Sequence, residues 1–491
     1  MEAYLLVLFA APLCASAFTA LLRNARVGEI LTVVSTLLLS AVSCLLMVET
    51  STGRKFLLLG DEFIVDSLTS LMLVVISFVS LMVSLYSPKY LAYEVERGVV
   101  AREKVVLFYV LLNAFIFTMI LVVTTNNIAI MWVALEATTI ATAHLVATYR
   151  TAEAIEASWK YIILCSTGIA FGLYGVVTLY YTAYLAGIPA PLLWTSLVDH
   201  AKMLEAHSTM VKIAFTLALV GFGTKAGLAP FHTWLPDTYS EAPPYVSALL
   251  ASILEGCAIY TLVRFYSVSV LAGVGAFAQT VLLVVGIASL FISSLHMLAV
   301  TDVNRLFALS SVEHMGIIAC ALGFGGYLGA LAAVFHVVNH ALVKSALFLS
   351  SGLVTLSYGT RKIEGIRGMM RSYPALGALV LAGAYAIIGG PPFGTFQSEL
   401  LAIMAGVKSG NPFALVLFLA AIVVAFAALL VSCTNMVFGE PASSTEKYPH
   451  ILKAPITILL LLSLLLGVYI PEPLRSCLEN AGRSIVGGGV P

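Results

Sequence analysis

The chain has 491 residues, of which 60% are hydrophobic and only 10% are charged, and its 25 basic residues balance its 25 acidic ones. A soluble domain carries about 25% charged residues, and the mean hydropathy here is +1.01. These values exclude a soluble enzyme and a nucleic-acid-binding protein, and they indicate an all-α, polytopic membrane protein.

Apolar runs that are long enough to cross a bilayer, about 20 residues each, recur along the whole chain. Bounded by charged or turn-forming residues, they predict about fourteen transmembrane helices, at residues 3–22, 28–48, 63–86, 105–123, 127–148, 159–184, 209–229, 243–266, 271–297, 306–325, 328–357, 374–407, 411–438 and 452–470. Glycine and proline end the seventh helix near Gly227 and Pro230, and they break the twelfth between Gly389 and Pro392.

The two interrupted helices divide the chain. Helices 4–8 contain Glu136, a break that follows Lys225, and Glu255, whereas helices 9–13 contain Lys344, a break, and Glu399. Matching helices interrupted by glycine or proline indicate inverted repeats with ion sites at mid-membrane depth. We therefore expect two inverted five-helix repeats, each with a broken helix, in a chain divided into residues 1–104 (helices 1–3), 105–266 (first repeat), 271–438 (second repeat) and 439–491 (last helix and tail).

The distribution of lysine and arginine predicts the orientation. Loops that follow odd-numbered helices, together with the adjoining helix ends, hold fifteen of these residues, and those on the other side hold eight. Because positively charged loops stay in the cytoplasm, we expect a multi-pass protein of the cell (cytoplasmic) membrane with both termini outside.

Cofactor motifs are missing from the sequence. The seven cysteines are scattered singly at positions 14, 44, 165, 257, 320, 433 and 477, without a CxxC pair. Iron–sulfur clusters and four-cysteine zinc sites need clustered thiolates, and no phosphate-binding loop or serine-hydrolase motif occurs. We expect no cofactor, metal or catalytic residue on this chain, so any redox centre must lie on a partner.

Ionisable residues inside the predicted helices carry the functional information. A charge at the bilayer centre costs at least about 2.5–3.5 kcal/mol, so such residues face the protein interior, pair with one another or contact water. The candidates are Glu136, His144, Lys225, Glu255, Glu313, His314, His336, His340, Lys344 and Glu399.

Glu136 and Lys225 suggest an electrostatic proton gate. Glu136 lies in the apolar run 128–146, and His144 follows two helical turns later on the same face. The break after Lys225 is expected to free backbone carbonyls and admit water. A buried lysine gives up its charge more readily than an exposed one, and a nearby acid restores it. A Glu–Lys pair can therefore store or release a proton as its separation changes.

His336, His340 and Lys344 are spaced four residues apart and share one helix face. Neutral imidazoles both donate and accept hydrogen bonds, so these residues could carry a proton toward Glu399, which follows the second break. The histidine pair could also bind a metal, but no suitably spaced carboxylate or cysteine supports that interpretation.

Structural roles remain open for the same residues. A buried Glu or Lys can fix helix register through an ion pair, and this alternative weighs most for Glu255 and Glu313. Among the histidines, a role in hydrogen-bonded packing or in a loop is expected for His144, His232, His296 and His314.

Four stretches of sequence carry a family resemblance: GFGTKAGLAPFHTWLPDTYSEAPPYVSALLAS, TDVNRLFALSSVEHMGII, FHVVNHALVKSALFLSSG and GGPPFGTFQSELL. They resemble the proton-translocating, antiporter-like membrane subunits of respiratory complex I, of Mrp-type cation/proton antiporters and of energy-converting membrane-bound hydrogenases. SSVEHMG and PPFGTFQSE look most like the formate hydrogenlyase-type branch.

The resemblance implies roles for individual residues. Lys225 matches the broken-helix lysine and Glu136 its glutamate partner, while Glu399 matches the terminal Lys/Glu of the second broken helix. His336, His340 and Lys344 match the central hydrophilic axis. One departure is Glu255, which stands where complex I homologues commonly carry Lys or His.

Three functions are consistent with these residues. The first is a proton- or sodium-translocating subunit of a redox-driven pump, a hydrogenase or NADH:quinone oxidoreductase-like complex. In such a complex other membrane subunits and a peripheral redox arm would hold iron–sulfur and nickel–iron centres. The second is a subunit of an Mrp-type cation/proton antiporter. The third is a membrane anchor whose ionisable residues only hold helices together.

Overall fold

The computed structural model describes residues 1–441 and 449–487, and almost every described segment is helical. The first half contains α1 (Glu2–Leu22), α2 (Ala25–Thr50), α3 (Ser67–Glu96), α4 (Arg102–Thr124), α5 (Ile128–Val146), α6 (Ala152–Leu185), α7 (Trp194–Asp199), α8 (Ser208–Ala226), α9 (Trp234–Glu241), α10 (Pro244–Leu249) and α11 (Glu255–Ser269). The second half contains α12 (Gly275–Met297), α13 (Val303–Phe324), α14 (Gly326–Tyr358), α15 (Met369–Ser372), α16 (Pro374–Ile387), α17 (Gly394–Lys408), α18 (Pro412–Val437), α19 (Lys453–Val468) and α20 (Glu472–Ile485).

Short elements complete the chain. A hairpin of β1 (Phe56–Leu58) and β2 (Phe63–Val65) joins α2 to α3. Short 3-10 helices are η1 (Ala147–Tyr149), η2 (Ala201–His207), η5 (Ile363–Gly365) and η6 (His450–Leu452), whereas η3 (Leu250–Leu254) and η4 (Val270–Val274) are π-helical.

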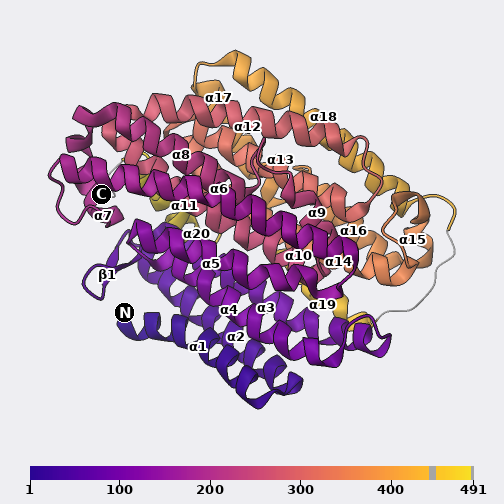
Figure 1. Cartoon of the computed structure of the whole chain (residues 1–491). Coiled ribbons are helices and arrows are strands. Elements are labelled where there is room, and N and C mark those ends of the chain that lie inside the picture. Colours follow the sequence, from indigo (N-terminus) through magenta and orange to yellow (C-terminus); the bar gives the residue numbers. More distant parts are fainter. Residues whose placement is uncertain (442–448, 488–491) are drawn as a thin grey trace.

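The long helices lie side by side in one bundle (Figure 1). The N-terminal helices α1 and α2 line one edge and α17 and α18 line the opposite edge. Between them α13 and α14 are almost wholly buried, whereas α1, α2 and α18 expose large apolar side chains such as Leu21, Leu37 and Val423. An apolar exterior around a polar-containing centre is the arrangement that a bilayer requires, and the chain is a multi-pass membrane protein.

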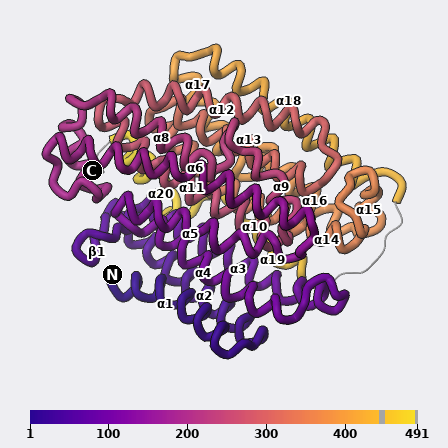
Figure 2. The backbone as a smooth tube through the Cα atoms, viewed as in Figure 1, coloured from indigo at the N-terminus to yellow at the C-terminus, as the bar shows by residue number. Residues whose placement is uncertain are grey.

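The C-terminal helices return to the N-terminal part of the bundle. In Figure 2 the yellow tube of α19 and α20 lies beside helices from the start of the chain, and both α19 and α20 pack against α3. Asn480 donates a hydrogen bond to the Ser51 carbonyl over 3.0 Å. The amphipathic α20 was not predicted, because its polar residues hide it from a search for long apolar runs.

Both helix breaks lie where glycine and proline predict them. Helix α8 ends at Ala226 with Gly227 in the left-handed conformation, and the chain continues through a loop into α9. The predicted twelfth helix is two helices, α16 and α17, separated by the segment that contains Gly389. A Cβ atom at Gly389 would overlap the Glu399 carboxylate, so this glycine makes the room that Glu399 occupies.

Twelve described helices are long and apolar enough to cross a membrane. The predicted number of about fourteen is not confirmed by this criterion. The 54-residue stretch Pro244–Met297 counts once, although Gly273 adopts a non-helical conformation within it, and neither half of the broken α16–α17 helix reaches the 18 residues required. The prediction that residues 63–86 are helical is wrong at its start, where β2 precedes α3. The division into two inverted repeats remains a prediction.

A buried ion pair fixes the start of α3. Arg264 donates hydrogen bonds to the two carboxylate oxygens of Asp66 over 2.7 and 2.9 Å, and the Thr69 N–H caps the helix on the same carboxylate. Burial alone would raise the pKa of Asp66, but the charge and hydrogen bonds of Arg264 hold it below its ordinary value. The pair therefore contributes stability above the unfolded pKa of about 3.9, and this contribution is lost as the pH falls through the folded pKa.

Replacement of Asp66 by Asn should lower the free energy of unfolding by about 3 kcal/mol at neutral pH, because Arg264 stays buried without a counter-ion. The difference in unfolding temperature between the variant and the wild type, measured in detergent, should narrow below about pH 4. Asp61→Asn, at an exposed position two residues before β2, is the control. A difference for Asp66→Asn that stays constant down to pH 3 would contradict this assignment.

Candidate functional site

Lys225 lies in the last turn of α8, directly before the first break, and its side chain is fully buried. Its ammonium group donates a hydrogen bond to the Thr139 hydroxyl, and a second to the Tyr161 hydroxyl over 3.3 Å. Its Nζ also lies 5.1 Å from the centre of the Tyr161 ring. The lysine is therefore held at the break by hydroxyl groups and an aromatic face.

Glu136 reaches Lys225 through Thr139. The Thr139 hydroxyl donates to Glu136 Oε2 over 3.2 Å, and Ser166 donates to Oε1 over 2.5 Å. The charges of Glu136 and Lys225 interact, but no direct ion pair joins them among the residues that the structure describes. The predicted pair is thus a three-residue unit, in which the threonine accepts from the lysine and donates to the glutamate.

Removal of this bridge should slow ion transport. We expect Thr139→Ala to reduce transport about tenfold, since a hydrogen bond to a charged group contributes about 1.5–3 kcal/mol, whereas Thr139→Ser should retain most of it. The measurement is proton flux in reconstituted vesicles at equal protein amount. Thr138→Ala is the matched control, because the Thr138 hydroxyl bonds only the carbonyl of Leu135 in its own helix. Equal fluxes for the Ala and Ser variants at position 139 would contradict a bridging role.

Aromatic side chains connect Lys225 to the second half of the molecule. The ring of Tyr161 lies 5.0 Å from that of Trp234, which lies 5.8 Å from that of Tyr239. The Tyr239 hydroxyl donates to Glu255 Oε1 over 2.8 Å. Glu255 is fully buried and begins α11 directly after the π-helical turn η3. It therefore lies between the two groups of ionisable residues.

Hydrogen bonds do not continue directly from Glu255 to the histidines. Within the part of the chain that the structure describes, Glu255 Oε2 has no hydrogen-bond partner, and it lies 3.9 Å from His340 Nε2, which also has none there. Because a hydrogen bond requires about 2.7–3.2 Å, a movement of about 1 Å would join them. Two facing, unpartnered buried atoms are costly unless they interact in another state.

Lys344 occupies the centre of the second group. It is fully buried, and it donates to the Phe307 carbonyl over 2.7 Å and to the Ser310 hydroxyl, both on α13. Its charge interacts with the carboxyl groups of Glu255 and Glu313. Two acids therefore flank this lysine, one from α11 and one from α13.

His314 links the histidines of α14 to each other. Its Nδ1 lies 2.8 Å from His336 Nε2, and its ring centre lies 5.4 Å from that of His340. Glu313 Oε2 lies 3.5 Å from His314 Nε2. The spacing of His336 and His340 on one face of α14 predicts that both could carry a proton, and the structure adds a third imidazole from α13 beside them.

His336 continues the row toward α17. Its Nδ1 lies 3.0 Å from the Ser398 hydroxyl oxygen, and Ser398 itself donates to the Thr395 carbonyl over 2.9 Å. Because the Ser398 hydroxyl donates to Thr395, it accepts a hydrogen bond from His336 Nδ1–H, and the neutral His336 then accepts one at Nε2 from His314 Nδ1–H. The hydrogen bonds thus have one direction, which would reverse after a proton has passed.

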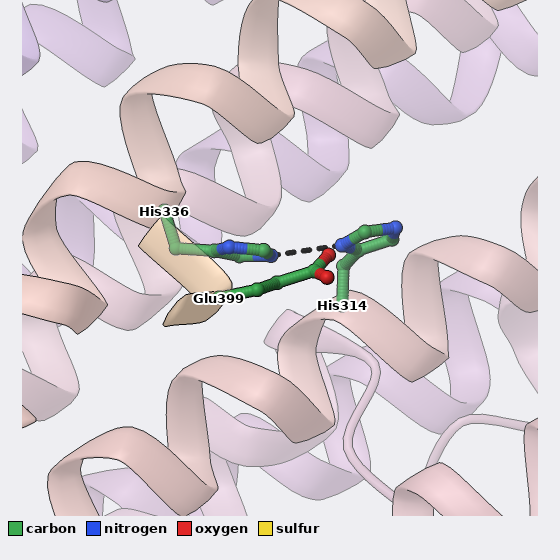
Figure 3. A group of neighbouring side chains, drawn as sticks. All are labelled: His314, His336 and Glu399. Carbon is green, nitrogen blue, oxygen red and sulfur yellow. Dashed lines mark hydrogen bonds between the residues drawn. The ribbon is translucent and has the colours of Figure 1, made fainter. Parts of the chain in front are cut away.

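Glu399 closes the row at the second break. Figure 3 shows its carboxylate beside the hydrogen-bonded rings of His314 and His336. Potential ligand atoms of these three residues lie within 4.8 Å of one another, a spacing that could hold a metal ion. The two nearest ring nitrogens are joined by a hydrogen bond, so the three side chains have the spacing for either a metal ion or a shared proton.

His144 lies apart from this row. It is exposed on the side of α5 that Glu136 and Ile140 also share, and it lines a lateral cavity of about 360 Å³ with Lys104 and Arg150. Glu136 is itself only partly buried from this side. The row of ionisable groups therefore begins near the lateral surface of the bundle.

Sequence patterns did not identify every member of the site. Thr139, Tyr239 and Ser398 were missed because hydroxyl groups are common in membrane helices and carry no charge that would mark them. His314 was a candidate for which hydrogen-bonded packing was favoured, and the structure places it in the middle of the histidine cluster, hydrogen-bonded to His336. The adjacent Glu313 was the available signal, since two ionisable residues in sequence are rare at membrane depth.

Comparison with known sequences gives consistent results. The family described as "NADH:quinone oxidoreductase/Mrp antiporter, TM" matches residues 125–425, and the one described as "NADH-Ubiquinone oxidoreductase (complex I), chain 5 N-terminus" matches residues 60–98. A relative described as "Hydrogenase-4 component F homolog", from Methylacidiphilum infernorum (isolate V4), is 36% identical over 426 residues, which are 85% of this chain and 89% of the relative.

Solved structures share the fold. A chain of the membrane-bound sulfane sulfur reductase, an archaeal respiratory membrane complex, superposes with a TM-score of 0.88 at 26% identity, over 99% of this chain and 98% of that one. A chain of the Mrp complex from Dietzia sp. DQ12-45-1b superposes with a TM-score of 0.86, over the same shares of the two chains. At 20% identity the second likeness concerns the fold alone.

Proposed function

The chain belongs to the NADH:quinone oxidoreductase/Mrp antiporter family of membrane proteins, and from this premise we propose that it is the proton-translocating subunit of a multi-subunit, redox-driven ion pump of the hydrogenase type. The observation that carries the proposal is the row of polar groups that runs from the partly buried Glu136 through the buried Lys225, Glu255 and Lys344 to Glu399. Such a row is expensive in a membrane unless charge moves along it.

The Glu136–Thr139–Lys225 unit would act as the gate. A charge that arrives beside Glu136 would strengthen or weaken its attraction for Lys225 and so change how firmly the lysine holds its proton. Moving one charge against 100 mV requires about 2.3 kcal/mol. A tenfold change in proton affinity is worth about 1.36 kcal/mol, so a change of about one hundredfold supplies the energy.

Release of a proton from Lys225 would drive proton transfer across the gap between Glu255 and His340. Loss of charge at Lys225 alters the field at Tyr239 and Glu255, and a protonated Glu255 could then donate to His340 Nε2. The proton would continue through His314 and His336 to Glu399, while Lys344 would hold a proton between cycles. Neutral imidazoles suit this role because each can accept at one nitrogen and release at the other.

Neighbouring subunits would supply the driving charge. The face of α5 that carries Glu136 and His144 is suited to contact another membrane subunit, since an acid there would otherwise face lipid. Redox centres, such as iron–sulfur and nickel–iron groups, would lie on a peripheral arm, because the sequence of this chain has no clustered thiolates to hold them. The proposed orientation keeps both termini outside the cytoplasm.

An Mrp-type cation/proton antiporter subunit is the alternative, favoured by the shared fold with the Mrp complex. The deciding experiment is purification in mild detergent followed by reconstitution. Co-purification of an iron–sulfur or nickel subunit is expected, with proton uptake that requires an electron donor when no membrane potential is imposed. Sodium-dependent pH changes in vesicles without any donor would instead support the antiporter.

A further inference from the structure

A second cavity lies apart from the row of ionisable residues. It has a volume of about 430 Å³, and its lining includes Glu94 near the end of α3, Tyr149 before α6, and Thr355 near the end of α14. These segments border loops rich in lysine and arginine, the side predicted to be cytoplasmic. The cavity therefore reaches into the bundle from the side on which a pump would take up protons.

Glu94 is the unusual member of this lining. Only 4% of it is exposed, and its carboxylate accepts hydrogen bonds from the hydroxyls of Tyr149, over 2.5 Å, and Tyr245, over 3.3 Å. In contrast, the neighbouring Glu241 is paired with Arg361. None of the described residues forms an ion pair with Glu94. A buried carboxylate that has hydroxyl partners and no cation can exchange a proton without breaking a salt bridge.

A seam of hydroxyl groups leads from Glu94 along the contact between α3 and α14. Tyr90, one turn before Glu94, donates to the Gly352 carbonyl over 3.4 Å, and Tyr86, one turn further, donates to the Leu349 carbonyl over 2.9 Å. Their rings are stacked at 5.3 Å. Gly352 permits the close approach, since an added Cβ would lie 2.9 Å from the Tyr86 hydroxyl.

The seam points toward Lys344. Lys344 precedes Gly352 by eight residues on the same helix, which corresponds to about 12 Å. Ser345, Ser350 and Ser351 are buried on this stretch of α14 and add hydroxyl groups to it. These hydroxyl groups lie between the cavity and the central lysine. Each donates to a backbone carbonyl, so their oxygen atoms remain available to accept a hydrogen bond from a passing proton carrier such as water.

We propose that Glu94 is the intake carboxylate through which protons from the cytoplasmic side reach Lys344 along the α3–α14 seam. This inference rests on the proposed function of the row of ionisable residues that runs from Glu136 to Glu399. A hydronium ion in the cavity protonates the carboxylate and leaves as water. The carboxyl group then releases that proton into the seam, and the neutral amine of Lys344 accepts it to become an ammonium group.

The test uses the whole complex in liposomes that contain a pH-sensitive dye. Proton influx is driven by a potassium diffusion potential, so no electron donor is needed. Glu94→Gln should reduce influx at least about tenfold, and Glu94→Asp should restore part of it. Glu96→Gln, at an exposed position on the same helix, is the matched control and should match the wild type. Wild-type influx in Glu94→Gln would overturn the inference.

Two further measurements separate intake from a structural role. Tyr149→Phe removes a hydrogen bond to Glu94 but keeps the carboxyl group, so it should impair influx much less than Glu94→Gln. Equal loss in both variants would overturn the inference. Thr355→Cys, labelled with a membrane-impermeant maleimide from the cytoplasmic side, should lose influx, and unchanged influx after complete labelling would also overturn it. In the proposed function the charge of Lys225 controls proton exchange at Glu255, next to Lys344, so Lys225→Met should also abolish influx even though protons enter at Glu94. If Lys225→Met keeps full influx, the proposed function itself fails, whatever Glu94→Gln shows.

Discussion

Replacement of Lys225 by Met should abolish proton transport while the complex still assembles. Lys225 is the only cation among the described residues that contacts the Thr139 bridge to Glu136. Methionine fills a similar volume but cannot hold a proton, so the gate would lose its charge without leaving a large cavity. We expect proton flux to fall at least about 100-fold, which corresponds to about 2.7 kcal/mol.

Lys212→Met on the same helix provides the control. Lys212 lies near the start of α8, where its ammonium group is 5.8 Å from the Phe277 ring centre and contacts no member of the row. Its removal should leave flux within about twofold of the wild type, as for most surface substitutions. If Lys225→Met instead prevented assembly, and flux fell only in proportion to the complex recovered, the lysine would be a structural element of a membrane anchor.

Replacement of Glu255 by Gln should uncouple the two halves of the molecule. Glutamine preserves the shape and can still accept from Tyr239, but it cannot pass a proton to His340 across the 3.9 Å gap. Flux should fall at least about 100-fold, the lower end of the contribution of a positioned proton donor. The measurement is again proton influx into liposomes that contain a pH-sensitive dye, and assembly of the complex is measured in parallel.

Tyr239→Phe distinguishes transfer from packing at this point. This variant removes the hydroxyl that donates to Glu255 and retains both the ring and the carboxyl group. Tyr239→Phe should reduce proton flux about tenfold or less, since it deletes one hydrogen bond. Retention of wild-type flux in Glu255→Gln would show that protons do not cross between the groups through this residue.

The elements that the sequence predicted well are those with a strong local cause. Gly227 and Gly389, each followed by proline a few residues later, force the two helix ends, and long apolar runs mark most helices. The hairpin before α3 was missed because β2 is apolar and continuous with the helix. Only the side chain of Asp66, which caps α3, marks the boundary.

The sequence predicted the charged residues of the candidate site, but it did not predict the hydrogen bonds and contacts that connect them. Burial of Glu136, Lys225 and Lys344 within helices follows from the cost of a charge in lipid. The bridging role of Thr139 and the insertion of His314 between the α14 histidines depend on how α5, α8, α13 and α14 pack. Periodicity along one helix cannot report such contacts between helices.

The most direct test of a single connected proton path is a comparison of Lys225→Met, Lys344→Met and the double variant under the same potassium diffusion potential. Two steps of one series path are non-additive, so each single variant should abolish influx and the double variant should be no worse. Two independent paths would give partial influx in each single variant and additive losses in the double variant, and that result would contradict the account.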